Sequence, residues 1–172
     1  MQRGASSVWF LLVAATAAGF VWVTSRKLPA LVAAHFGTSG IATGFILHKT
    51  YLFATLFACI VLPVMIVVPI SVALNDPNAT IKVPNRDYWL APERRARTVE
   101  FIRKQMMRFG AALLVFICYV HWLVVRANEQ TPPRLAAGPF VSAIAVFVGF
   151  AVVWSAIHYT HFRAVGGQHD GT

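Results

Sequence analysis

Four long apolar runs limit what this chain can fold into more than any other feature of its sequence. The runs cover approximately residues 8–24, 50–74, 109–125 and 138–159, and none of them contains an aspartate or a glutamate. Each run is close to the roughly 20 residues that an α-helix needs to cross the hydrocarbon core of a bilayer. Backbone groups without partners are costly in lipid, so such segments cross it as helices. The sequence therefore predicts an all-α integral membrane protein with four transmembrane helices.

Composition favours the same class. Hydrophobic residues make up 58% of the 172 residues and charged residues only 12%, which leaves too little polar surface to cover a soluble domain. The net charge of +9 would suit a nucleic acid in a soluble protein, but most of the excess lies in one loop between two apolar runs. Such a cluster fits anionic lipid headgroups better. We expect one membrane domain over residues 1–172, membrane lipids as partners and no nucleic acid.

The first apolar run has a rival interpretation as a cleaved signal peptide. Arg3 precedes the run, and several alanines inside it are small enough for a cleavage site. However, the run is longer than a signal-peptide core, and cleavage would have to fall within it. We expect the run to be retained as the first span.

The distribution of lysine and arginine predicts the orientation. With four spans, the two termini and the loop 75–108 share one side of the membrane and carry ten basic residues, whereas the other side carries five. Basic loops stay in the cytoplasm. Both termini and loop 75–108 are therefore predicted inside, and loop 26–49 is predicted outside.

The outer loop, residues 26–49, is expected to form a short interfacial segment. Pro29 suits the first position of a helix and Gly37 can end one, while Phe36 can lie against the membrane surface. Gly40 falls in the flexible stretch that follows. The sequence favours an interfacial helix here.

The cytoplasmic loop leads into the third span through an amphipathic helix. Pro92 suits the first helical position, Glu93 favours the positive end of the helix dipole, and apolar residues then recur at helical spacing. Basic residues on the polar face are expected to contact lipid headgroups. These residues are Arg97, Arg103, Lys104 and Arg108.

Histidines are the ionisable residues of interest near the outer side of the membrane. His121 lies in the third span, and His35 and His48 lie in the outer loop. His35, His48 and His121 could bind zinc if the fold brought them together, but their spacing follows no fixed ligand pattern. His158 and His161 share a helical face, yet bis-histidine haem ligation within the bundle would need another histidine at the same depth. We expect structural or interfacial histidines, with no metal and no cofactor.

No arrangement of residues in the sequence points to catalysis. Cys59 and Cys118 lie in apolar runs, where a thiolate is disfavoured. Asp87 and Glu93 have arginines beside them, which favours ion pairs and helix capping over acid–base chemistry. The chain is therefore predicted not to be an enzyme and to have no catalytic residues.

A small-solute transporter is a weaker hypothesis. Pro63 and Pro69 predict a kink in the second span, and broken helices form substrate sites in transporters. Membrane helices also tolerate proline for packing alone. In addition, the spans lack the carboxylates of a proton relay.

Two separated motifs resemble a known family. The outer motif contains Leu28-Pro29, His35-Phe36-Gly37, Gly40 and Gly44-Phe45, and the inner motif is Pro-Asn-Arg-Asp-Tyr-Trp-Leu-Ala-Pro-Glu-Arg-Arg at residues 84–95. Together they resemble the bacterial membrane domain family of unknown function found at the front of SdpI-type toxin-immunity proteins, and most of all its small stand-alone four-span branch. The resemblance covers roughly residues 8–125. It implies a four-span topology in a bacterial cytoplasmic membrane, but no established activity.

These observations favour a non-catalytic sensor or immunity-type binding protein. Its outer loop would bind a peptide or lipid, and its inner loop would dock a cytoplasmic protein. The alternative is a structural accessory subunit of a larger membrane complex, because small residues one turn apart let helices approach closely. The candidate binding residues are Pro29, His35, Phe36 and Gly40 outside, and Asn85, Arg86, Asp87, Tyr88, Trp89, Pro92, Glu93, Arg94 and Arg95 inside.

Overall fold

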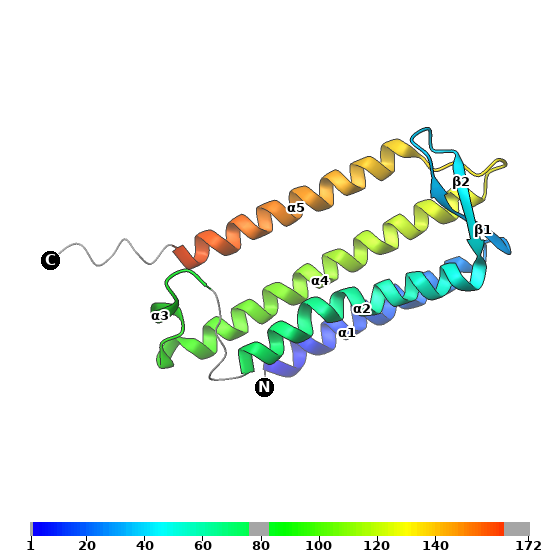
Figure 1. Ribbon diagram of the computed structural model, residues 1–172. Coiled ribbons are helices and arrows are strands. Elements are labelled where there is room, and N and C mark those ends of the chain that lie inside the picture. The colour runs from blue at the N-terminus through cyan, green and yellow to red at the C-terminus, as the bar shows by residue number, and fades with distance from the viewer. Residues whose placement is uncertain (1, 76–82, 164–172) are drawn as a thin grey trace.

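The computed structural model describes residues 2–75 and 83–163 of the chain, so part of the predicted cytoplasmic loop, residues 76–82, lies outside the described residues. Four long helices lie side by side, with a β-hairpin at one end of the bundle and a short helix at the other (Figure 1). We call these the hairpin end and the loop end. The elements are α1 (Gln2–Ser25), β1 (Leu31–Phe36), β2 (Ala42–Leu47), α2 (His48–Asn75), α3 (Arg86–Trp89), α4 (Pro92–Asn128) and α5 (Ala137–Arg163).

Each of the helices α1, α2, α4 and α5 is long and apolar enough to cross a membrane. This agrees with the four predicted spans and supports a multi-pass membrane protein. The predicted amphipathic helix and the third span form one helix, α4, of 37 residues. At about 1.5 Å per residue α4 is about 55 Å long, well beyond the roughly 30 Å of hydrocarbon. Its loop-end portion therefore extends past the apolar part of the bundle.

The packed core lies between α1, α2 and α4. Val21 of α1, Cys59 of α2 and Leu114 of α4 are among its most deeply buried members. Helix α5 instead runs along another side of α4 (Figure 1). Of its described side chains only Phe162, near its last turn, is buried. Helix α5 is thus anchored near its loop end, and most of its length faces the surroundings.

The outer loop differs from its prediction. An antiparallel hairpin occupies residues 31–47, with Leu31 opposite Leu47 and Ala33 opposite Phe45, so the predicted interfacial helix and the all-α class are wrong there. In β2 the side chains alternate between half-buried and exposed, which is the two-residue period of a strand. Two short apolar runs separated by a five-residue turn with two glycines are typical of a hairpin.

Helix α2 runs without interruption through Pro63 and Pro69. Pro63 is fully buried. Its ring therefore contributes to packing, which is the use of proline that membrane helices commonly tolerate.

Candidate functional site

The inner motif folds back onto the last turn of α5. Asn85 has left-handed backbone angles (φ 51°, ψ 44°), and its Nδ2 donates hydrogen bonds to the carbonyl oxygens of Phe162 (3.0 Å) and Arg163 (3.3 Å). Trp89 Nε1 donates to the Phe162 oxygen as well, at 3.0 Å. Carbonyls in the last turn of a helix have no partner inside the helix. Asn85 and Trp89 therefore cap α5 from more than 70 residues away in the sequence.

Stacked rings hold this junction together. The rings of Trp89 and His161 stack with centroids 5.0 Å apart, and His161 stacks on Phe101 of α4 at 4.3 Å. Phe162, only 1% exposed, meets Trp89 edge-on. Thr98 Oγ1 donates to the Trp89 carbonyl oxygen at 2.8 Å. Helices α3, α4 and α5 are thereby joined at the loop end.

The other residues of the motif leave charge on the surface. Arg94 lies over the ring of Tyr88, with its guanidinium carbon 3.9 Å from the ring centroid, a cation–π contact. Asp87 lies in the first turn of α3 and Glu93 in that of α4. A carboxylate at this position interacts favourably with the positive end of the helix dipole. The exposed members of the predicted site are Asn85, Arg86, Asp87, Pro92, Glu93 and Arg94, and the half-buried ones are Tyr88, Trp89 and Arg95.

The predicted lipid-headgroup residues lie on α4 at the same end. Arg97 and Arg108 are exposed, and Arg103 and Lys104 are half-buried. Lys104 Nζ forms an ion pair of 2.7 Å with Glu100, whereas Arg108 Nη1 donates to the neutral amide oxygen of Gln105 at 3.1 Å. The loop end therefore combines an aromatic anchor with a positively charged surface.

At the hairpin end, Asn128 binds the edge of β1. Its Oδ1 accepts from the Ala33 amide at 2.8 Å, and its Nδ2 donates to the Ala33 carbonyl at 3.0 Å and to Val124 at 2.9 Å. One side-chain amide thus makes the paired hydrogen bonds that a neighbouring strand would make. The hairpin is fixed to the last turn of α4 in this way.

The hairpin turn also contacts the α4–α5 linker. The Leu135 amide donates to the Gly40 carbonyl at 2.8 Å, and the Ala42 amide donates to Pro133 at 3.2 Å. Gly40 has a φ of +79°, and a Cβ built there would overlap the Leu135 carbonyl oxygen. Only glycine fits this position.

The outer candidate residues therefore divide into two groups. Gly40 and Phe36 are structural, because Gly40 contacts the linker and Phe36 packs against a cluster that includes Tyr51. Pro29 and His35 are exposed. The accessible part of the predicted outer site is thus smaller than its sequence motif.

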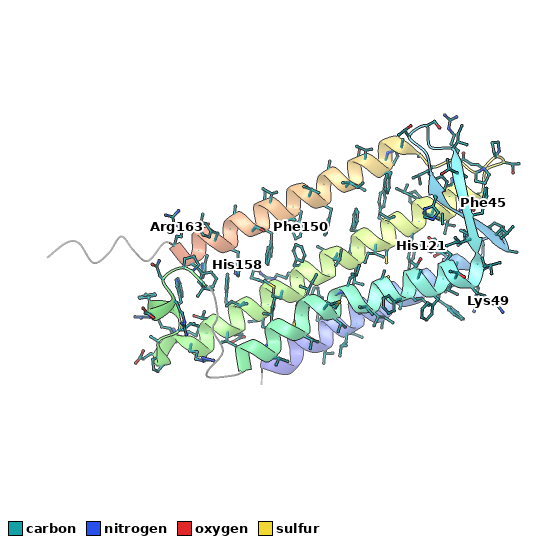
Figure 2. All side chains as sticks on the ribbon, viewed as in Figure 1. Phe45, Lys49, His121, Phe150, His158 and Arg163 are labelled. Atoms are coloured by element: carbon teal, nitrogen blue, oxygen red, sulfur yellow. The ribbon has the colours of Figure 1, made fainter. Side chains whose placement is uncertain are left out.

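His121 is buried near the hairpin end of α4 (Figure 2). Its Nδ1 is 2.8 Å from Tyr51 Oη of α2, and its Nε2 is 2.8 Å from Thr24 Oγ1 of α1. Because the Thr24 hydroxyl donates to the Phe20 carbonyl at 2.6 Å, it must accept from His121, which assigns the imidazole proton to Nε2. Tyr51 then donates to Nδ1. A neutral histidine therefore joins three membrane helices.

The sequence singled out His121 but missed its partners. Thr24 and Tyr51 lie on other spans, and nothing in their local sequence marks them. Within residues 2–75 and 83–163, no three His, Cys, Asp or Glu side chains are grouped so that they could hold a metal ion. The three outer histidines are thus not assembled into a zinc site, and both ring nitrogens of His121 already have protein partners.

Comparison of the chain with protein-family models, with curated proteins and with solved structures gives no match. The resemblance carried by the two loop motifs therefore stays a prediction.

Proposed function

We propose that this protein is a non-catalytic binding protein of the cell envelope whose loop end docks a soluble protein partner. One observation supports this most. Within a single short motif, Asn85 and Trp89 are hydrogen-bonded to the end of α5, while Arg86 and Arg94 remain exposed. Residues held in place by a rigid base can present charge without a large loss of conformational entropy on binding.

The excess of basic residues on the N-terminal, loop and C-terminal side supports a cytoplasmic position for the loop end. We accordingly propose that the hairpin faces outward in the cytoplasmic membrane of a bacterium, as the resemblance to the SdpI-type family implies. An outer peptide or lipid ligand would contact Pro29 and His35. Phe36 and Gly40 would support that surface from beneath.

The chemistry of the loop end favours an acidic partner surface. Three arginines, Arg86, Arg94 and Arg97, are exposed there. They outnumber the exposed carboxylates, which are Asp87 and Glu93. Complementary charge speeds encounter and fixes the register of docking.

Site-specific photocrosslinking in native membranes tests the proposal. A probe at Tyr88 should give a protein adduct, and the double substitution Arg86→Gln, Arg94→Gln should abolish it without loss of membrane insertion or thermal stability. A probe at Phe45, at the hairpin end, should not give the same adduct. An adduct that persists in the double variant would refute docking through these arginines.

The exposed length of α5 favours the alternative of an accessory subunit in a larger membrane complex, since an apolar helix with one buried side chain could pack on another protein. Purification in mild detergent as a lone monomer would argue against that alternative. A small-solute transporter has less support, because α2 is not broken at its prolines, and liposome uptake assays would test it directly.

A further inference from the structure

The basic residues of α4 at the loop end and its lipid-facing residues deeper in the membrane form one stripe. Arg97, Lys104, Arg108, Val115 and Tyr119 follow one another at intervals of seven, four, seven and four residues. These intervals keep side chains on one face of a helix with 3.6 residues per turn. A positively charged row is therefore continuous with an apolar ridge.

Two apolar grooves flank this ridge. One lies between α1 and α4 and has a volume of about 590 Å³, and the other lies between α4 and α5 and has a volume of about 620 Å³. Val115 and Tyr119 line both grooves. The grooves thus run side by side, separated only by the stripe of α4.

We propose that a single anionic phospholipid straddles α4 here, with one acyl chain in each groove and its phosphate at Arg108 and Lys104. Arg108 contacts a neutral amide, and the ion pairs found in the described part of the chain do not include it. Lys104 has three ammonium protons, so its pair with Glu100 leaves donors for a phosphate. Two apolar channels beneath a cationic row match the two chains and the charged headgroup of such a lipid.

The dimensions fit one leaflet. Arg108 and Tyr119 are eleven residues apart, about 16 Å along the helix axis. One leaflet of hydrocarbon is about 15 Å thick. A phosphate at Arg108 would therefore place the acyl chains in the parts of the grooves that Val115 and Tyr119 line. Lipid binding at this site requires no soluble partner at the loop end.

Native mass spectrometry of the full-length protein, with added phosphatidylglycerol, phosphatidylcholine of identical chains and lysophosphatidylglycerol, tests the site. We expect one diacyl phosphatidylglycerol to bind more tightly than either of the other two lipids. The double substitution Lys104→Gln, Arg108→Gln should weaken its binding roughly 25-fold, at roughly fivefold for each basic residue near the surface. Arg126→Gln is the matched control, because Arg126 lies on the same stripe at the opposite end and pairs with Glu129.

A second variant tests the grooves. Ser142→Trp, at an exposed position of α5 that lines the α4–α5 groove, should fill the groove without disturbing the core. It should reduce binding of the diacyl lipid to the level of the lysolipid. Equal binding of phosphatidylcholine, or unchanged binding by the Lys104 and Arg108 variant, would overturn the headgroup assignment. Equal binding of the lysolipid by the unmodified protein would overturn the two-chain arrangement.

Discussion

The two ends of the bundle are held by different kinds of contact. At the hairpin end, backbone hydrogen bonds join the hairpin to the α4–α5 linker, and the polar side chains of His121 and Asn128 join helices and strand. At the loop end, stacked rings and two side-chain donors fasten the last turn of α5. The hairpin end therefore joins α1, α2 and α4 to the hairpin and the linker, whereas the loop end holds the last turn of α5.

The two motifs also differ in how many of their residues remain accessible. Two of the four outer candidates serve the fold itself, since Gly40 contacts the α4–α5 linker and Phe36 packs against the cluster that includes Tyr51. The inner motif uses Asn85 and Trp89 for anchoring and leaves Arg86, Asp87, Glu93 and Arg94 exposed. Exposed charged residues next to the anchoring residues Asn85 and Trp89 favour our proposal that the loop end is the binding surface.

The largest effect is expected at the hairpin turn. Gly40→Ala would introduce a Cβ at a φ of +79° and against the Leu135 carbonyl. The backbone strain and the overlap should lower the free energy of unfolding by about 2–4 kcal/mol. Thermal unfolding in detergent measures this.

Gly138→Ala is the matched control for that substitution, because a Cβ at Gly138 meets no atom within 4 Å. It should change the free energy of unfolding by less than about 1 kcal/mol. Equal effects of the two substitutions would contradict the tight turn at Gly40.

A smaller loss is expected from His121→Phe. The ring volume is roughly kept, but the Tyr51 hydroxyl loses its acceptor and Thr24 loses its donor. Stability should fall by about 1–3 kcal/mol, and Tyr51→Phe should cost less, because it removes one hydrogen bond without leaving a tyrosine hydroxyl unpaired. His35→Phe, at an exposed site, serves as the control in the same unfolding assay. If His121→Phe were as stable as that control, the hydrogen bonds of His121 to Tyr51 and Thr24 would not contribute to stability.

The smallest effect is expected at the loop end. Asn85→Gly keeps the left-handed backbone accessible and removes only the hydrogen bonds to the carbonyls of Phe162 and Arg163. Stability should fall by about 0.5–1.5 kcal/mol, and Asn85→Ala should cost about 1 kcal/mol more through backbone strain. Hydrogen exchange should accelerate in the last turns of α5 and stay unchanged in the hairpin. Acceleration at both ends would show that the two ends are not independent.

Much of the architecture could be predicted because it depends on local composition. Each of the four apolar runs lies within one long helix, and Pro92 begins α4 as expected. The hairpin was not predicted, because Pro29 and Gly37 are spaced like the ends of a short helix. The two-residue period of the strands was present in the same stretch. Asn128 gave no signal, because its role requires a strand edge far away in the sequence.

The sequence by itself determined that the chain enters a membrane, where its helices lie and which loops carry charge, because hydrophobicity and charge act on each segment separately. The tertiary structure decided which motif residues are internal and which are accessible, and that His121 meets Tyr51 and Thr24. It also decided that a row of basic residues lies above two apolar grooves. These arrangements depend on packing between segments distant in the chain, and no local pattern encodes that.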